Sequence, residues 1–137
     1  MPRLHLAAVA NRLPRWAEAA RDEYLSRMPR GYEVELILVK PSAAQRLPGR
    51  LPPGARVVAL DERGRDLTTP QFSKLLAEPT VFVIGAADGL DPEIRKRAAM
   101  LIKLSSLTLP HALAQVTLCE QLYRAATLLT GHPYHRE

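Results

Sequence analysis

The sequence predicts an α/β fold in which a mainly parallel sheet is flanked by helices. Short apolar runs alternate along the chain with stretches whose apolar residues recur at helical spacing, the order typical of a parallel sheet with crossover helices. One of these runs, Thr80–Ile84 (TVFVI), is apolar throughout, as expected of a strand buried on both faces. A chain of 137 residues suffices for one core, so we expect a single domain over residues 1–137.

The first part of the chain should supply two strands, one helix and a long connection. Leu4–Val9 reads as a short strand, and apolar residues then recur at helical spacing over residues 13–28. Pro14 suits the first turn of that helix, where a missing N–H costs nothing. Residues 33–39 (EVELILV) form the second strand. Residues 40–55 hold four prolines and two glycines, so we expect a crossover loop with at most a short helix.

The second part should supply three more strands and two short helices before the last helix. Thr69 and Asp91 are each followed by proline, a pattern in which the first side chain caps the helix and proline takes the first helical position. We therefore expect helices over residues 70–77 and 92–99. The strands are expected at residues 56–60 (RVVAL), 80–84 and 100–104.

The last helix, residues 111–129, has an unusually wide apolar face. Two neighbouring rows of apolar residues run along it: Leu118, Leu122, Ala125 and Leu129, and Val116, Cys119, Tyr123 and Ala126. The polar strip that remains consists of Thr117, Glu120, Arg124 and Thr127, in which Glu120 and Arg124 form an i,i+4 pair. Packing on one sheet does not require so wide a face, so we expect a second subunit on one side of this helix.

Composition and charge narrow the class of protein. Nineteen Lys and Arg against fourteen Asp and Glu give a net charge of +5, which suits a polyanionic partner such as RNA, DNA or an anionic membrane surface. The single cysteine, Cys119, excludes an intrachain disulfide, fits a reducing compartment and lies in an apolar stretch typical of a buried, inert thiol. No apolar run approaches the length of a membrane span, so we expect a soluble, cytoplasmic protein.

Three segments are candidate ligand sites because they follow strands of the predicted sheet. Ligands of open α/β sheets bind beyond the carboxyl ends of the strands, which here lead into residues 60–64, 84–89 and 104–111. Small residues in the second segment allow close approach to the backbone, and alternating leucines in the third suit an adenine ring. The second segment matches neither a dinucleotide fingerprint nor a P-loop, and ordinary turns remain the alternative.

The chain ends in GHPYHRE, which concentrates titratable side chains in the last few residues. His132 and His135 are possible metal ligands, but no cluster of cysteines or carboxylates completes a set, so we expect no metal. His5 is expected in the core or at a sheet edge. The run of residues 95–97 (RKR) reads as a solvated helix face, with a phosphate contact as the alternative.

Several longer motifs resemble one known family. They are VVALDERG with TTPQF, FVIGAADGL, LSSLTLPH, EQLYRA and the tail HPYHRE, and with the first strand and helix they cover nearly the whole chain. The chain resembles the ribosomal RNA large subunit methyltransferase H family, which belongs to the SPOUT (trefoil-knot) methyltransferases. The resemblance implies a homodimer with a deep C-terminal trefoil knot that binds S-adenosylmethionine and methylates N3 of a pseudouridine in 23S ribosomal RNA. Because a small domain with modest charge has little surface with which to hold one nucleotide of bare RNA, we expect the assembled ribosome as the substrate.

The resemblance also implies roles for individual residues. The expected cofactor contacts are Leu60, Gly85, Leu104, Ser105, Ser106, Leu107, Thr108 and Leu109. In the tail, we expect His135 to act as general base, Arg136 to stabilise the anionic base or hold a phosphate, and Tyr134 to stack on or hydrogen-bond the target base.

Two departures from the family pattern qualify this picture. Ala86 stands where the family usually has a second glycine, and the crossover at residues 40–55 is shorter than in many relatives. Ala86 is tolerable unless its position needs a positive φ. An RNA-binding SPOUT-like module without methyl transfer and an unrelated nucleotide-binding α/β domain are the alternative readings.

Overall fold

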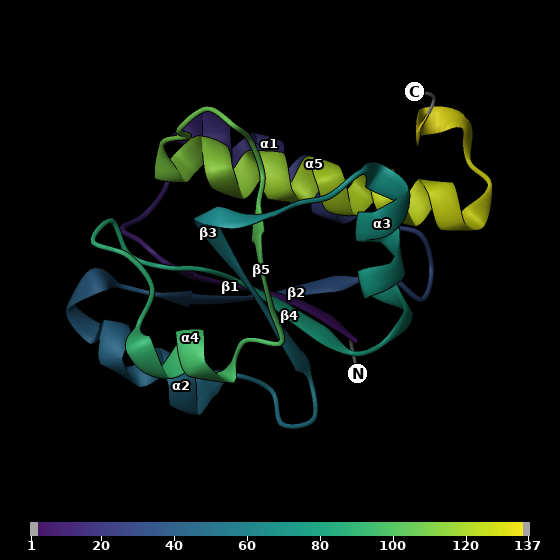
Figure 1. Ribbon diagram of the computed structural model, residues 1–137. Helices are drawn as coiled ribbons and strands as arrows, with labels where there is room; N and C mark the ends of the chain where they lie inside the picture. Colours follow the sequence, from purple (N-terminus) through teal and green to yellow (C-terminus); the bar gives the residue numbers. More distant parts are fainter. Residues whose placement is uncertain (1–2, 136–137) are drawn as a thin grey trace.

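Five parallel strands form one sheet in the order β2-β1-β4-β3-β5 (Figure 1). The computed structural model describes residues 3–135 and, for His135, the backbone alone. The strands are β1 (Leu4–Val9), β2 (Val34–Val39), β3 (Arg56–Asp66), β4 (Thr80–Ile84) and β5 (Met100–Lys103). The predicted parallel α/β fold is therefore confirmed.

Helices cover both faces of this sheet (Figure 1). The α-helices are α1 (Arg15–Ser26), α2 (Leu47–Arg50), α3 (Thr69–Ser73), α4 (Pro92–Arg97) and α5 (His111–Thr130), and the 3₁₀ segments are η1 (Pro41–Arg46), η2 (Lys74–Ala77) and η3 (Pro133–His135). Helices α1, α3 and α5 lie on one face, and α2 and α4 lie on the other. Within residues 3–135, no helix is both long enough and apolar enough to span a membrane.

The two faces of the sheet bury two separate apolar clusters because side chains alternate along a strand. Leu6 of β1 packs in the cluster beneath α5, whereas its neighbour Ala7 packs in the cluster that includes Leu47 of α2 and Ile94 of α4. Every residue of β1 and β4 is buried. This confirms the expectation that the run at β4 is buried on both faces.

Of the two predicted helix caps, the structure confirms the one at α4 and corrects the one at α3. Asp91 caps α4, because its carboxylate accepts a hydrogen bond from the backbone N–H of Glu93 at 2.8 Å. The expected cap at Thr69 is wrong. Thr68 is the cap, and it forms a capping box in which its hydroxyl accepts from the Gln71 N–H and the Gln71 side chain accepts from the Thr68 N–H.

Helix α5 buries its wide apolar face almost entirely within one chain. Leu118, Leu122 and Ala125 are fully buried, as are Cys119 and Ala126 of the second row. The sheet, α1 and α3 cover these residues, so the width of the face requires no second subunit. Thr127, expected in the polar strip, is also buried, and its hydroxyl donates to the carbonyl of Arg124 at 2.8 Å. Leu129 alone in the two rows is exposed, to 44%.

Strand β3 is longer than predicted and pairs with β5 twice. The expected end was residue 60, but the strand runs to Asp66. Leu60 pairs with Ile102 of β5, and after a break in register Arg65 pairs with the same Ile102. Residues 61–64 therefore leave the ladder and return to it. Gly64 lies directly on β5 at this return, where an added Cβ would be 2.5 Å from the carbonyl carbon of Ile102.

Adding a single methyl group at Gly64 should destabilise the fold, because the backbone of β5 occupies its place. We expect Gly64→Ala to lower the free energy of unfolding by about 1–3 kcal/mol, because two backbones must separate to admit the Cβ. Urea unfolding measures the difference. Gly49→Ala in α2 is the matched control, because nothing lies within 4 Å of its added Cβ. Equal stability of the two variants would contradict the role assigned to Gly64.

Candidate functional site

A cavity of about 720 Å³ opens at the carboxyl end of β4, beside residues 60–63 of β3. Its walls come from the segment that follows Leu60, from the loop after β4, and from the beginnings of α4 and α5. The lining residues are Leu60 to Arg63, Ile84 to Leu90, Arg95, Leu109, His111 and Ala114. Its volume falls in the range of about 300–1,000 Å³ typical of small-molecule sites, and residues of all three predicted candidate segments contribute to its walls.

A second, smaller cavity of about 170 Å³ continues from the first. The two share Leu60, Ile84 and Leu109 among their walls. The smaller one adds the loop that leads from β5 to α5, with Lys103, Leu104, Ser105, Leu107 and Thr108 as lining residues. An elongated ligand can therefore extend from this loop into the larger cavity.

Most of the expected cofactor residues line one cavity or the other. Leu60 and Leu109 line both, Gly85 lines the larger, and Leu104, Ser105, Leu107 and Thr108 line the smaller. Ser106 lines neither cavity and is exposed. Three further lining residues, Asp61, Arg95 and His111, were not among the expected cofactor contacts, although Asp61 and His111 belong to two of the candidate segments and Arg95 to the basic run. The position of Asp61 directly after residue 60 was the available signal for that residue.

The loop after β4 is a tight turn that leaves no room for a side chain at Gly85. An added Cβ there would be 2.8 Å from the carbonyl oxygen of Gly89. Gly89 has a φ of +112°, and its N–H donates to the carbonyl of Ala86 at 2.9 Å. Ala86 does not adopt a positive φ, so its methyl group fits the backbone conformation that the loop requires.

A carboxylate and a guanidinium form an ion pair at the wall of the larger cavity. Asp61 accepts a hydrogen bond from the backbone N–H of Arg63 at 2.7 Å and one from Arg95 of α4 at 2.5 Å. The Arg63 N–H, followed by the Arg95 guanidinium, lowers the pKa of Asp61 below its usual value, so the carboxylate is ionised at neutral pH. Arg95 is exposed, as expected of the basic run, but it also lines the cavity.

The tail is anchored at the far end of α5 from this cavity. The Tyr134 hydroxyl donates to Glu120 at 3.0 Å, and its ring lies 4.6 Å from that of Tyr123 with the Arg124 guanidinium 5.5 Å away. Burial, together with hydrogen bonding to Tyr24 and Glu120, raises the pKa of Tyr134, so the phenol remains protonated. The predicted Glu120–Arg124 pair is confirmed, with Nη2 and Oε2 at 2.6 Å.

The other two candidate catalytic residues cannot be placed in this picture. The side chain of His135 and all of Arg136 lie outside the described residues. Tyr134 lines neither of the two cavities. His132 accepts a hydrogen bond from the backbone N–H of Tyr134 at 3.2 Å, which is a local contact of the turn.

His5 and Cys119 are buried in the fold and line neither cavity. His5 is buried and lies 3.1 Å from Glu35 on the neighbouring strand. Cys119 is buried as predicted, and burial raises the pKa of its thiol to about 12, which makes it a poor nucleophile at neutral pH. In the part of the chain from residue 3 to residue 135, no three His, Cys, Asp or Glu side chains gather as a metal site would require.

Comparisons of the sequence with known proteins point to one family. The family model described as "Predicted SPOUT methyltransferase" matches residues 2–135. Proteins named ribosomal RNA large subunit methyltransferase H are 46% identical in Burkholderia thailandensis and 45% identical in Polynucleobacter asymbioticus, each over 98% of this chain and 99% of the relative. The first alignment spans 154 positions, more than the 137 residues of this chain, so the relative carries residues that this chain lacks.

Comparisons of the structure find the same fold at low sequence identity. A probable methylase family protein from Haemophilus influenzae superposes with a TM-score of 0.62 at 10% identity, over 99% of this chain and 71% of that one. The TrmH/SpoU tRNA modifying enzyme of A. aeolicus gives 0.56 at 14% identity, over 96% and 79%. AviRb of Streptomyces viridochromogenes, solved in complex with AdoMet, gives 0.50 at 14% identity, over 93% and 60%.

The Asp61–Arg95 pair should make the stability of the protein depend on pH in acid. Because the pKa of Asp61 is lower in the folded protein than in the unfolded chain, where it is about 3.9, its ionised form stabilises the fold above that pH. This contribution is lost as the pH falls through the folded-state pKa. We expect Asp61→Asn to cost about 1 kcal/mol at pH 7, and to lose this disadvantage progressively below about pH 4.

Urea unfolding of both proteins between pH 2 and pH 7 provides the measurement. The control is Glu93→Gln, which removes an exposed carboxylate 4.0 Å from Arg97 and should leave the curve nearly unchanged. A constant difference between wild type and Asp61→Asn over this range would contradict the assigned pKa direction.

Proposed function

Because the chain belongs to the SPOUT methyltransferase family, in the group of ribosomal RNA large subunit methyltransferase H, we propose that it transfers a methyl group from S-adenosylmethionine to 23S ribosomal RNA. The observation that carries the proposal is the pair of continuous cavities at the strand ends, where seven of the eight residues expected to contact the cofactor lie. The specific target is N3 of a pseudouridine, as the family resemblance implies.

The two cavities suit the two ends of the proposed cofactor. The loop that leads from β5 to α5 offers leucine side chains for the faces of an adenine ring and backbone groups for its edge. The amino-acid end would then extend past Gly85 into the larger cavity, whose wall includes the loop that the missing side chain at Gly85 allows to turn tightly. When bound, S-adenosylmethionine would supply an electrophilic methyl group on a sulfonium centre. No metal takes part in this proposal.

The tail should supply the groups that act on the target base. N3 of a uracil-type base carries a proton, which must leave before or during methyl transfer, and His135 is the proposed base. Arg136 would stabilise the negative charge that develops on the ring or bind a neighbouring phosphate. Tyr134 was expected to contact the base itself. Because Glu120, Tyr123 and Arg124 hold its side chain, we assign it instead to fixing the direction of the two residues that follow.

The length of α5 separates this tail from the cavity of its own chain. His111 at the first turn of α5 lines the cavity, whereas the tail follows the last turn (Figure 1). A helix of 20 residues is about 30 Å long, and Arg136, two residues after the anchored Tyr134, lies at most about 7 Å of chain from it. We therefore propose a homodimer in which the tail of one subunit completes the cavity of the other.

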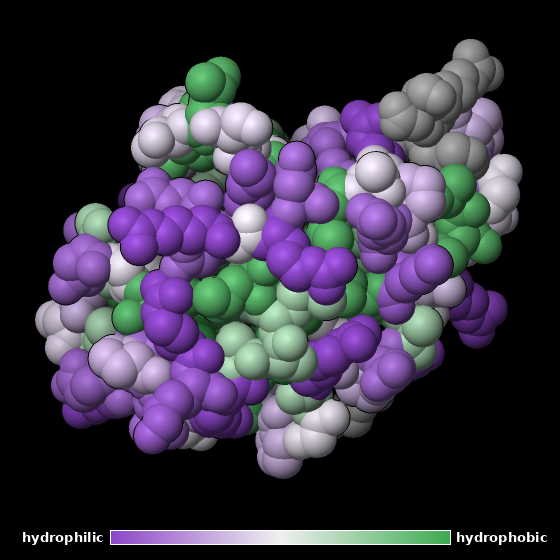
Figure 2. Space-filling model, in the orientation of Figure 1, coloured by the Kyte–Doolittle hydropathy of each residue, from purple (hydrophilic) through white to green (hydrophobic). Residues whose placement is uncertain are grey.

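Apolar surface at both ends of α5 supports this dimer. Leu107 and Leu113 near the cavity are 78% and 40% exposed, and Leu129 near the tail is 44% exposed. Figure 2 shows green apolar surface that lies among hydrophilic residues on the displayed face. Leu118 is fully buried within the chain, so a charge at that position would unfold the protein and would not simply separate the subunits.

The knot, the single domain and the substrate form part of the same proposal. The C-terminal trefoil knot is proposed from the family to which the chain belongs. A single small domain with a net charge of +5 has little surface with which to hold one nucleotide of naked RNA, so the substrate should be the assembled ribosome, in the cytoplasm. The alternative of an RNA-binding module without methyl transfer depended on Ala86, whose backbone conformation accommodates alanine.

The proposed activity can be tested with radiolabelled S-adenosylmethionine. We expect methyl transfer to purified large subunits or ribosomes from cells that lack this protein, and little transfer to naked ribosomal RNA. Mass spectrometry of the labelled nucleoside should identify N3-methylpseudouridine. Binding of the cofactor by calorimetry without transfer to either substrate would contradict the proposed activity and favour a binding module.

A subunit-mixing experiment tests the shared site. One subunit lacks residues 134–137 but keeps its cavity, and the other carries Gly85→Leu, whose side chain clashes with the Gly89 backbone and so disrupts the cavity wall but keeps the tail. Each homodimer should be inactive, whereas the isolated mixed dimer has one intact site of two and should recover about half of the wild-type activity. A mixed dimer that forms but stays inactive would show that each tail serves its own subunit.

A further inference from the structure

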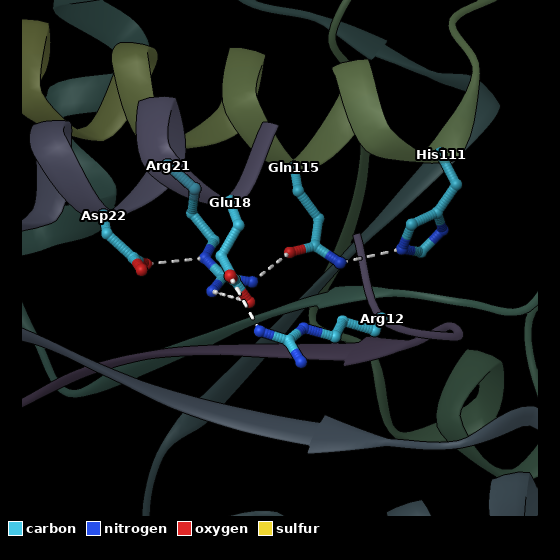
Figure 3. Close-up of polar contacts among 6 residues, drawn as sticks. All are labelled: Arg12, Glu18, Arg21, Asp22, His111 and Gln115. Carbon is cyan, nitrogen blue, oxygen red and sulfur yellow. Dashed lines mark hydrogen bonds and ion pairs between the residues drawn. The ribbon is translucent and has the colours of Figure 1, made fainter. Parts of the chain in front are cut away.

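A chain of polar contacts connects the larger cavity to a buried arginine in α1 (Figure 3). His111 lies at the first position of α5 and lines the cavity. Its Nε2 is 2.9 Å from the amide nitrogen of Gln115, one turn further along the helix. The amide oxygen of Gln115 is 3.2 Å from Nη1 of Arg21. Gln115 and Arg21 are 1% and 5% exposed, so this is a buried polar connection between two helices.

Arg21 determines which way the Gln115 amide points. A guanidinium has hydrogen-bond donors and no acceptor, so the amide group that faces Arg21 must be the oxygen. The guanidinium is itself held in place, with Nε donating to Asp22 at 2.9 Å and Nη2 lying 4.0 Å from Glu18. The reversed amide would place two donors face to face in a buried site.

The orientation of the amide in turn determines the protonation of His111. The Gln115 amide nitrogen donates, so the facing Nε2 of His111 must accept with its lone pair. A neutral imidazole with an unprotonated Nε2 carries its proton on Nδ1. Burial also lowers the pKa of His111, which favours the neutral ring. Among the described residues Nδ1 has no hydrogen-bond partner.

We propose that His111 is a cofactor-binding residue that donates its Nδ1–H to the carboxylate at the amino-acid end of S-adenosylmethionine, and that Gln115 and Arg21 are positioning residues for this donor. The inference rests on the proposed function for the identity of the ligand. If the adenine lies against the loop of the smaller cavity, the amino-acid end extends into the larger cavity, whose wall includes His111.

The charged side chains that line the larger cavity include few free donors for a carboxylate of the ligand. They are Asp61, Glu62, Arg63, Asp88 and Arg95. Three of the five are acidic, and Arg95 already pairs with Asp61 at 2.5 Å. A donor that keeps one tautomer binds a carboxylate without first reorienting its proton, which is the benefit of preorganisation.

The first test needs no ligand and no activity. In protein labelled with ¹⁵N-histidine, long-range ¹H–¹⁵N spectra distinguish the two neutral tautomers and the cation. We expect the His111 signals, assigned by their loss in His111→Phe, to report a neutral ring protonated on Nδ1 at pH 7. In Gln115→Glu the carboxylate can accept from Nε2–H, so the ring should change to the Nε2–H tautomer or the cation. An Nε2–H ring in wild type, or an unchanged ring in Gln115→Glu, would overturn the positioning roles.

The second test measures binding of two cofactor analogues by calorimetry. S-adenosylhomocysteine has the amino-acid end, and 5′-methylthioadenosine lacks it. Because a hydrogen bond to a charged group contributes roughly 1.5–3 kcal/mol, His111→Phe should weaken S-adenosylhomocysteine binding about tenfold or more. It should leave methylthioadenosine binding nearly unchanged, and His111→Asn, which retains a donor, should recover part of the loss.

The outcomes separate this inference from the proposed function. Equal losses for the two analogues, or no loss for either, would overturn the contact between His111 and the carboxylate. Failure of wild-type protein to bind either analogue would instead overturn the proposed cofactor and, with it, this contact. The spectroscopic result on Arg21, Gln115 and His111 does not depend on either binding result.

Discussion

The close contact between Gly64 and β5 is the constraint on which the site depends. Residues 61–64 leave the ladder after Leu60 and return to pair again at Arg65, and both ends of this excursion meet Ile102. The return is possible because Gly64 presents no Cβ to the Ile102 backbone. The excursion itself forms one wall of the larger cavity. The missing side chain at Gly64 therefore allows β3 to pair with β5 a second time and leaves a ligand-sized space beside the two strands.

The direction and length of α5 explain why one chain holds only part of the chemistry. The helix begins at the cavity with His111 and ends about 30 Å away, where Glu120 and Arg124 anchor the tail through Tyr134. In the proposed function, the same helix thus begins at the cofactor site and leads at its other end to the catalytic tail. The symmetric dimer that we propose would bring unlike ends of two identical subunits together twice, which would turn this separation into two complete sites.

Local sequence patterns predicted the elements well and their junctions poorly. The apolar run at β4 and the cap at Asp91 were readable because each depends on neighbouring residues. Thr68 was missed because the proline signal favoured Thr69, whereas Gln71 completes the capping box with Thr68. Gly64 carries no local signal, because its requirement comes from Ile102, which is far away in the sequence.

For the candidate site, too, the sequence predicted some features and missed others. The segments at the strand ends were predictable because parallel strands share one carboxyl edge, and Leu60 and Gly85 do line the cavity. The width of the apolar face of α5 suggested a partner, but a single chain buries it, because α1 and α3 both pack against this helix together with the sheet. Sequence spacing gives the width of a face and does not say how many elements of the same chain will cover it.

Buried polar residues are where a site depends on contacts that no sequence pattern reveals. Arg21 reads from its helical position as one more surface charge of α1, yet it is 5% exposed. Burying a guanidinium is costly unless its donors are matched, and a leucine would fill the space between α1 and α5 without that cost. Retention of the charge makes physical sense if its value lies in fixing the Gln115 amide and, through it, the imidazole at the cavity wall. The buried arginine then acts on the ligand through Gln115 and His111, because its donors fix the direction of each hydrogen bond along this chain.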